Sequence, residues 1–272
     1  MKNCIIYLLR SSQEDIDMLN KSLGLLELNL LQFTRNCDVI IFHENDLYSL
    51  KGSIHSSIPL MFVEIDMKPP VYPEEISSKI LEYFPHPTHG NGPVAYGHKG
   101  FTIGYRNMCR FFSGEFYKME IIHNYEYYLR LDTDSYILTP LNYDIFEFAK
   151  QNDLIYGFCS PAIQVDNQKV VEGLNNFVKN YIEINSIKTF VNIDLIENGR
   201  MFYTNFELGK VSWFIQSKYL DFYKAIDESG NIYIKRWGDA PIKYLGVNLF
   251  CEPTKIIPVR GFTYQHGAVY NL

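Results

Sequence analysis

The chain has 272 residues, 47% of them hydrophobic, which is enough for one large α/β domain or two small ones. Its net charge of −6 argues against a nucleic-acid-binding surface, because such a surface needs a basic patch. No apolar run is long enough for a membrane span or for the core of a signal peptide.

The five cysteines are widely spaced and include no C-x-x-C pair, so a structural zinc site is not expected. Reduced thiols are usual in a reducing compartment. With no membrane span in the sequence, we expect a soluble protein in the cytoplasm.

The N-terminal quarter predicts a β-α-β unit. Apolar runs at residues 4–9, 38–43 and 60–65 indicate buried strands. Apolar residues spaced by three and four over residues 13–34 indicate an amphipathic helix. This order predicts a parallel sheet with right-handed crossovers.

The middle of the chain is less regular. Residues 66–104 are rich in proline and glycine, which predicts a long turn-rich excursion, and residues 105–118 predict a helix. Thr139-Pro140 is typical of a helix N-cap followed by a first turn, so we expect a helix from there to about residue 152. Residues 161–204 are ambiguous and read as mostly helical.

Two carboxylates follow a buried strand. The apolar run at residues 127–131 ends in Asp132-Thr133-Asp134, and ligands in open α/β sheets bind beyond the carboxyl ends of the strands. Hard oxygen ligands suit Mg²⁺ or Mn²⁺, and such a cation can hold the diphosphate of a nucleotide-sugar. The alternative is a turn that the Asp side chains stabilise.

Four blocks carry a family resemblance. Residues 105–114 resemble "YRxMCRF-x-SG", residues 205–209 resemble "NFEIG", residues 236–241 reproduce "RWGDAP", and residues 264–266 resemble a terminal "Y-x-H". These are motifs of the fungal Golgi α-1,2-mannosyltransferases, glycosyltransferase family 15, and they occur in the family's order.

The chain also departs from the family. The family usually has Glu-Pro-Asp where this chain has Asp132-Thr133-Asp134, which is similar to the general DxD of metal-dependent glycosyltransferases. The membrane anchor and stem of the fungal enzymes, which are lumenal proteins, are not in this sequence. We therefore expect a soluble, anchor-less relative, with an excised catalytic domain as the alternative.

The resemblance implies a metal site and a donor. Asp132 and Asp134 are expected to bind Mn²⁺, with Mg²⁺ as the alternative, on the diphosphate of GDP-mannose. His266 matches the family's terminal histidine and is expected to complete the site, because neutral imidazole is a good Mn²⁺ ligand.

Glu207 matches the family glutamate proposed for the β-face of mannose. The family's reaction retains the anomeric configuration, so Glu207 is the expected catalytic residue, as a nucleophile, a stabiliser of positive charge or an acceptor from a sugar hydroxyl. The alternative is a structural carboxylate that pairs with neighbouring Lys210.

Four side chains are candidates for donor binding. Arg10 follows the first strand, where a nucleotide would lie, and Tyr105 matches the family's motif tyrosine. Arg106 and Arg110 offer bidentate donors to phosphate. The alternative for these two arginines, one helical turn apart, is ion pairing.

Trp237 and Asp239 are candidates for the acceptor site. An indole face packs against sugar C–H groups, and a carboxylate accepts hydrogen bonds from sugar hydroxyls. Asp239 is also a candidate N-cap for a helix that begins near Ala240-Pro241.

We therefore expect a single GT-A-like α/β domain over residues 1–272, with a mixed, mainly parallel sheet flanked by helices. Residues 1–135 are expected to bind the nucleotide-sugar, and residues 136–272 to bind the acceptor and carry catalysis. The expected reaction moves mannose from GDP-mannose to a mannose-terminated glycan or glycoprotein through an α-1,2 linkage. Alternatives are another donor such as a UDP-sugar, a degenerate glycan-binding protein, and a metal-dependent phosphodiesterase.

Overall fold

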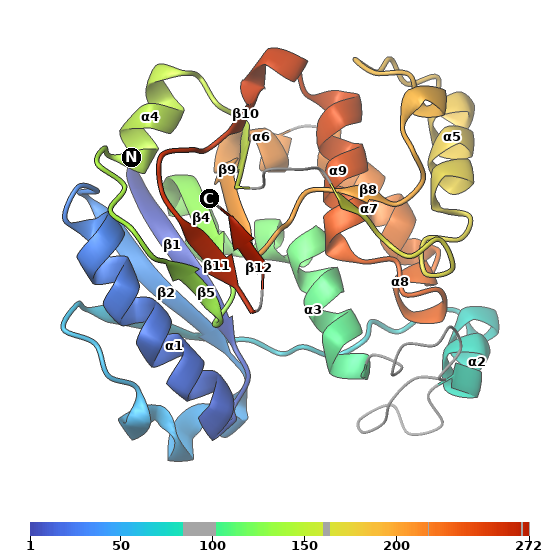
Figure 1. Cartoon of the computed structure of the whole chain (residues 1–272). Coiled ribbons are helices and arrows are strands. Elements are labelled where there is room, and N and C mark those ends of the chain that lie inside the picture. Colours follow the sequence, from blue (N-terminus) through green and yellow to red (C-terminus); the bar gives the residue numbers. More distant parts are fainter. Residues whose placement is uncertain (84–101, 160–163, 217, 268, 272) are drawn as a thin grey trace.

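A central sheet of seven strands organises the molecule (Figure 1). The computed structural model describes residues 1–83, 102–159, 164–216, 218–267 and 269–271. The strand order is β10-β6-β9-β4-β1-β2-β3. The strands are β1 (Lys2–Leu9), β2 (Cys37–His43), β3 (Leu60–Glu64), β4 (Tyr125–Leu131), β6 (Tyr156–Phe158), β9 (Phe206–Lys210) and β10 (Ile256–Pro258).

The sheet is mixed and mainly parallel, as predicted. Strands β3, β2, β1 and β4 are parallel neighbours, and β10 is parallel to β6. Strand β9 runs antiparallel to both of its neighbours, β4 and β6. Strands from both halves of the chain thus share one sheet, which supports a single domain.

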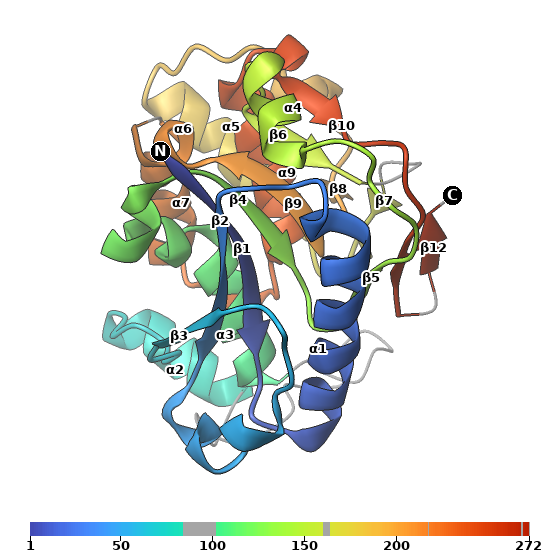
Figure 2. The ribbon, with the colours of Figure 1, turned by 90° about the vertical axis from the view of Figure 1, so that its left-hand side faces the viewer.

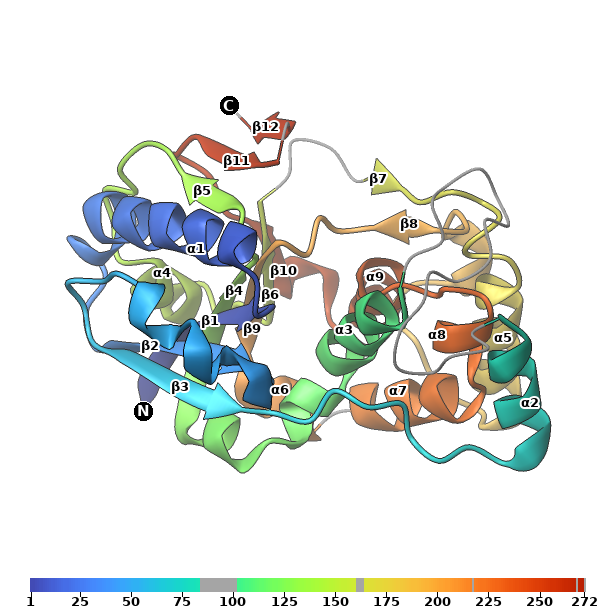
Figure 3. The ribbon, with the colours of Figure 1, turned by 90° about the horizontal axis from the view of Figure 1, so that it is seen from below.

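Helices cover both faces of the sheet. In Figure 1, α1 and α4 lie on the left of the sheet, and α3, α7, α8 and α9 lie on the right. Seen from below, α3 and α9 are neighbours (Figure 3). The helices are α1 (Gln13–Leu26), α2 (Glu74–Tyr83), α3 (Ile103–Ser113), α4 (Ile145–Gln151), α5 (Leu174–Ile184), α6 (Val211–Gln216), α7 (Tyr219–Glu228), α8 (Asn231–Ile234) and α9 (Asp239–Phe250).

Helix α1 follows from its sequence pattern. Ser12 caps it by accepting a hydrogen bond from the backbone N–H of Asp15. Ile16, Leu19 and Leu23 are buried at spacings of three and four, so one stripe of the helix packs on the sheet. Figure 2 shows α1 alongside β1 and β2.

Two smaller sheets complete the fold. One is antiparallel and joins β5 (Ser135–Ile137) to the C-terminal strands β11 (Tyr264–His266) and β12 (Val269–Asn271). The other pairs β7 (Gln164–Val165) with β8 (Arg200–Met201). The β5–β11 pairing brings the C-terminal segment against the turn that follows β4.

The helix expected from Thr139 begins later, at Ile145. Asp144 is its N-cap and accepts from the backbone N–H groups of Phe146 and Glu147. The preceding residues are held elsewhere, since the N–H of Leu141 donates to the carbonyl of Asn29. These tertiary hydrogen bonds outweigh the local signal of Thr139-Pro140.

The expected turn-rich excursion contains helix α2, and its residues 84–101 lie outside the described part of the chain. The segment 161–204, which was predicted to be mostly helical, contains one α-helix, α5, and two short strands where it is described.

The five cysteines are free. Among the described residues, no helix combines the length and apolar character needed to span a bilayer.

Candidate active site

A tight turn presents Asp132 and Asp134 at the carboxyl end of β4. The backbone N–H of Asp132 donates to the hydroxyl of Ser135 at 3.1 Å, and the backbone N–H of Ser135 donates to the Asp132 carbonyl at 3.0 Å. The Ser135 hydroxyl also donates to the carbonyl of Asn205 at 3.0 Å. The turn is therefore anchored to the segment around Asn205. The carboxylates of Asp132 and Asp134 are both half-buried.

His266 reaches the same place from the end of the chain. It pairs with Ser135 across strands β11 and β5. Its Nε2 lies 3.1 Å from Oδ1 of Asp134 and 3.7 Å from Oδ2 of Asp132. Its Nδ1 lies 3.0 Å from the hydroxyl of Tyr203. The three side chains predicted to bind metal thus lie together.

The pKa values of His266 and Asp134 shift in opposite directions, because each residue stabilises the charged form of the other. Burial lowers the pKa of His266, but its hydrogen bond to Asp134 and the negative charges of Asp132 and Asp134 outweigh burial and raise it above its usual value. The same hydrogen bond lowers the pKa of Asp134. The pair therefore favours a charged carboxylate facing the imidazole.

The donor atoms fit a hard or borderline cation. Two carboxylates and one imidazole nitrogen are ligands that Mn²⁺ accepts, and carboxylate oxygens also suit Mg²⁺. Across the described ranges, no three His, Cys, Asp or Glu side chains already converge as a metal site. Here Asp134 and His266 are instead hydrogen-bonded to each other.

Arg130 is a residue of the site that the sequence analysis missed. Its guanidinium is almost fully buried and donates to Oδ1 of Asp132 at 3.2 and 3.3 Å and to Oδ2 of Asp239 at 2.6 Å. It also lies 3.5 Å from the ring centroid of Phe112, at cation–π distance. Arg130 therefore holds one oxygen of Asp132, while the other oxygen is the one nearer His266.

Asp239 is the inner anchor of Arg130. It is 5% exposed and also accepts a hydrogen bond from Thr204 at 3.0 Å. Burial raises its pKa, but the charge and hydrogen bond of Arg130 outweigh burial and hold the pKa below its usual value. Asp239 begins α9, whose N-cap is Gly238. The N-cap is therefore Gly238 and not Asp239, and the buried ion pair with Arg130 does not favour the predicted acceptor contact.

Glu207 is a buried carboxylate on β9. It lies opposite Arg130 in the β4–β9 register, so both side chains point to one face of the sheet. It accepts hydrogen bonds from Tyr128, from Tyr156 at 3.1 Å and from Lys243 at 3.2 Å. Glu207 is 1% exposed.

The structural partner suggested for Glu207 was wrong. Lys210 points to Asp153, with an Nζ–Oδ1 distance of 3.0 Å. The ammonium that pairs with Glu207 comes from Lys243 on α9, in a different part of the chain.

Two of the four donor candidates are held inside the fold. Arg106 is buried and donates to the carbonyl of Tyr233 at 2.9 Å. Arg110 binds Asp227 through two hydrogen bonds of 2.8 and 2.9 Å. The ion-pair alternative therefore describes Arg110, whereas Arg106 binds the backbone. These contacts do not favour phosphate binding by either side chain.

Of the other two donor candidates, Arg10 is exposed and Tyr105 is partly buried. Arg10 lies at the end of β1, as predicted, with its side chain 72% exposed and paired with Asp15 at 2.7 Å. Tyr105 lies in the first turn of α3, partly buried. Its ring centroid is 5.8 Å from the guanidinium of Arg236.

Trp237 does not line an open surface. It is 2% exposed, its indole N–H donates to the carbonyl of Glu172 at 3.1 Å, and its ring packs against Phe177. The predicted stacking on an acceptor sugar is therefore not supported, because no ring face is available.

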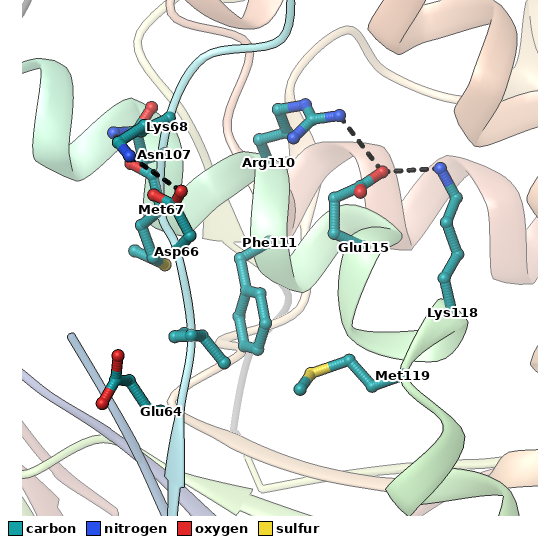
Figure 4. Close-up of a pocket in the computed structure, with 11 residues that line it drawn as sticks. Glu64, Asp66, Met67, Lys68, Asn107, Arg110, Phe111, Glu115, Lys118 and Met119 are labelled. Atoms are coloured by element: carbon teal, nitrogen blue, oxygen red, sulfur yellow. Dashed lines mark hydrogen bonds and ion pairs between the residues drawn. The ribbon is translucent and has the colours of Figure 1, made fainter. Parts of the chain in front are cut away.

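A cavity of about 330 Å³ lies between α3 and the chain that follows β3 (Figure 4). Five of its six charged side chains pair within the cavity, since Glu115 bridges Arg110 and Lys118, and Lys68 binds Asp66. The sixth, Glu64, accepts a hydrogen bond from the hydroxyl of Tyr48. None of the three predicted metal-binding side chains lines it. With three carboxylates and three cations in its lining, the cavity indicates no particular ligand.

Lys243 and Tyr203 were also missed. A sequence signal existed for Arg130 and Lys243, because each is a lone cation within an apolar strand or helix. Burial of an isolated cation is costly, so such a residue needs a partner. No comparable signal marked Tyr203.

The sequence model of a family described as "Glycolipid 2-alpha-mannosyltransferase" matches residues 5–272. The probable mannosyltransferase MNT3 of Candida albicans is 30% identical over 263 residues, covering 87% of this chain and 69% of the relative. The O-glycoside alpha-1,2-mannosyltransferase omh1 of Schizosaccharomyces pombe is 32% identical over 169 residues, covering 60% of this chain and 43% of the relative. The latter match thus spans less than half of the relative.

Solved structures show the same fold. Core-mannan synthase A from Aspergillus fumigatus, in an Mn/GDP form, matches with a TM-score of 0.80 at 23% identity, covering 100% of this chain and 76% of that one. The mannosyltransferase Ktr4p of Saccharomyces cerevisiae matches with a TM-score of 0.81 at 24% identity, covering 99% and 71%. The expected GT-A-like architecture is confirmed.

Proposed function

The chain belongs to the glycolipid 2-alpha-mannosyltransferase family of glycosyltransferases, and from this premise we propose that it is a metal-dependent, retaining mannosyltransferase. Its donor is GDP-mannose, and its acceptor is a mannose-terminated glycan that receives an α-1,2 linkage. The observation that carries the proposal is the meeting of Asp132, Asp134 and His266 beyond β4.

The three side chains would hold Mn²⁺, with Mg²⁺ as the alternative. When bound, the cation neutralises charge on the diphosphate of the leaving group. The presence of Mn and GDP in the related core-mannan synthase A supports both the metal and the nucleotide. Arg130 orients Asp132 by holding its Oδ1.

The remaining roles are assigned from exposure and charge. Arg10 and Tyr105 are the proposed donor contacts, because Arg106 and Arg110 are engaged inside the fold. Glu207 is proposed to stabilise positive charge that develops on the sugar. A nucleophilic role is less favoured, because the carboxylate is buried and its oxygens already accept hydrogen bonds. With Trp237 and Asp239 buried, we assign no acceptor residue.

The division into a donor half, residues 1–135, and an acceptor half, residues 136–272, is retained as a proposal. The metal site takes Asp132 and Asp134 from the first half and His266 from the second. The cytoplasmic location expected from the sequence remains a prediction.

A donor panel tests the function. We expect transfer or slow hydrolysis of GDP-mannose, read by mass spectrometry, to exceed that of UDP-glucose, UDP-galactose and UDP-GlcNAc at equal concentration. Turnover of a UDP-sugar with none of GDP-mannose would instead support the alternative donor. A folded protein that binds glycans and turns over no donor would indicate a degenerate binding protein.

Removing the hydroxyl of Tyr203 should weaken metal binding. A metal-bound histidine commonly hydrogen-bonds through its second ring nitrogen, and loss of such a partner typically costs about 10- to 100-fold in affinity or activity. Because Tyr203 lies 3.0 Å from Nδ1 of His266, Tyr203→Phe should reduce Mn²⁺ affinity by this factor in calorimetry with GDP present. Tyr48→Phe, which removes an exposed hydroxyl bonded to Glu64, is the matched control. Equal affinity in both variants would refute the role of Tyr203.

A further inference from the structure

Lys243 is a fully buried ammonium with no role so far in the proposed reaction. It lies on α9 with 0% exposure. Its Nζ donates to Oε1 of Glu207 at 3.2 Å and to the hydroxyl of Tyr117. The Nζ also lies 4.5, 4.8 and 5.5 Å from the ring centroids of Tyr117, Phe214 and Tyr219. Aromatic rings and the carboxylate of Glu207 therefore contact this cation, and the charges of Asp239 and Arg130 also act on it.

The two oxygens of Glu207 have different surroundings. Oε1 accepts from Lys243, from Tyr128 and, at 3.5 Å, from Tyr117. In the part of the chain that the structure describes, Oε2 accepts one hydrogen bond, from Tyr156 at 3.1 Å. Because a carboxylate oxygen offers about two acceptor sites, Oε1 is saturated and Oε2 retains capacity.

Stability alone does not account for this pair. A buried ion pair is often no more stable than a well-packed apolar pair of the same volume, because desolvation offsets the attraction. Burial is also the largest influence on the pKa of Lys243, which it lowers despite the opposing effect of Glu207. The ammonium thus lies in an unfavourable environment for its charge, which indicates a role beyond packing.

We propose that Lys243 is a positioning residue that acts through Glu207. It holds Oε1 and so fixes the orientation of the buried carboxylate, whose negative charge acts on the positive charge that develops on the reacting sugar. This inference rests on the proposed function, because it requires Glu207 to act on the donor. It predicts that the effect of Lys243 on turnover disappears when Glu207 is replaced.

A double-mutant cycle tests this dependence. The proteins are the wild type, Lys243→Met, Glu207→Gln and the double variant, each assayed with GDP-mannose and Mn²⁺. We expect each single variant to lower kcat about a hundredfold, with KM for the donor within about twofold of wild type. The double variant should have the kcat of Glu207→Gln to within about threefold, rather than the ten-thousandfold loss expected of independent residues.

Lys210→Met is the matched control. Lys210 lies on the same strand as Glu207 but binds Asp153, so its removal should leave kcat and KM unchanged. A merely structural Lys243 would lower the melting temperature and leave the kcat of the folded protein near wild type, and this result would overturn the proposal. Multiplicative losses in the double variant would overturn it as well.

Two further comparisons apply if Lys243→Met does not fold or if the wild type is inactive. If Lys243→Met does not fold, the double variant, which removes both charges, is compared with Glu207→Gln, and a lower kcat in the double variant contradicts the proposal. If the wild type turns over no GDP-mannose, the proposed function fails, and the inference fails with it. Turnover by the wild type with a multiplicative cycle rejects the inference alone.

Discussion

Glu207→Gln is expected to lower kcat at least about a hundredfold, which corresponds to roughly 2.7 kcal/mol of lost transition-state stabilisation. The amide keeps the shape of the side chain and removes its charge. A group that stabilises developing positive charge acts in the transition state more than in the ground state. GDP affinity should therefore change little, and the product of any residual activity should remain the α-anomer.

The buried Glu207–Lys243 pair means that Glu207→Gln also affects the stability of the protein. Glu207→Gln leaves Lys243 buried without a counter-charge, and breaking such a pair typically costs about 3–5 kcal/mol of stability. A lower melting temperature is thus expected even if Glu207 is catalytic. The double variant with Lys243→Met should recover stability without recovering kcat. Recovery of both, or turnover like that of the wild type in folded Glu207→Gln, would contradict the catalytic role.

Asp134→Ala is expected to remove the effect of Mn²⁺ on GDP binding. Asp134 contributes one of the three proposed ligands, so its loss should weaken GDP binding in Mn²⁺ by at least about tenfold, or about 1.4 kcal/mol. Its partner His266 is partly exposed, and such pairs contribute at most about 1 kcal/mol to stability. The variant should therefore fold, and titration calorimetry can measure its affinity.

Asp194→Ala is the matched control for this variant. Asp194 is exposed and pairs with Lys179. Its replacement should leave the Mn²⁺-dependent affinity for GDP unchanged. An equal fall in GDP affinity in both variants would mean that removing any surface carboxylate weakens binding. Asp134 would then not be a specific metal ligand.

Local patterns predicted the regular part of the fold well. The apolar runs at residues 4–9 and 38–43 became β1 and β2, and the spacing of Ile16, Leu19 and Leu23 became the buried stripe of α1. These features follow from side-chain periodicity, which is local. The later start of α4 was not predictable, because hydrogen bonds to distant residues decide it.

The residues of the site were predicted only in part. Asp132 and Asp134 are visible as a motif after a strand, but His266 was assigned through family resemblance, because only the β5–β11 pairing brings it near. The burial of Trp237 and Arg106 depends on α5 and α8 packing against them, which no local pattern reveals. Arg130 and Lys243 were missed, although each is a lone cation in an apolar element, because their buried partners Asp239 and Glu207 are distant along the chain.

The most direct test of the central claim is the affinity of the wild-type protein for GDP, measured by calorimetry with Mn²⁺ and again with EDTA. The claim is that Asp132, Asp134 and His266 form a metal site that serves a nucleotide-sugar. It predicts that GDP binds at least about tenfold more tightly with Mn²⁺. Equal affinity for GDP in both conditions would contradict it.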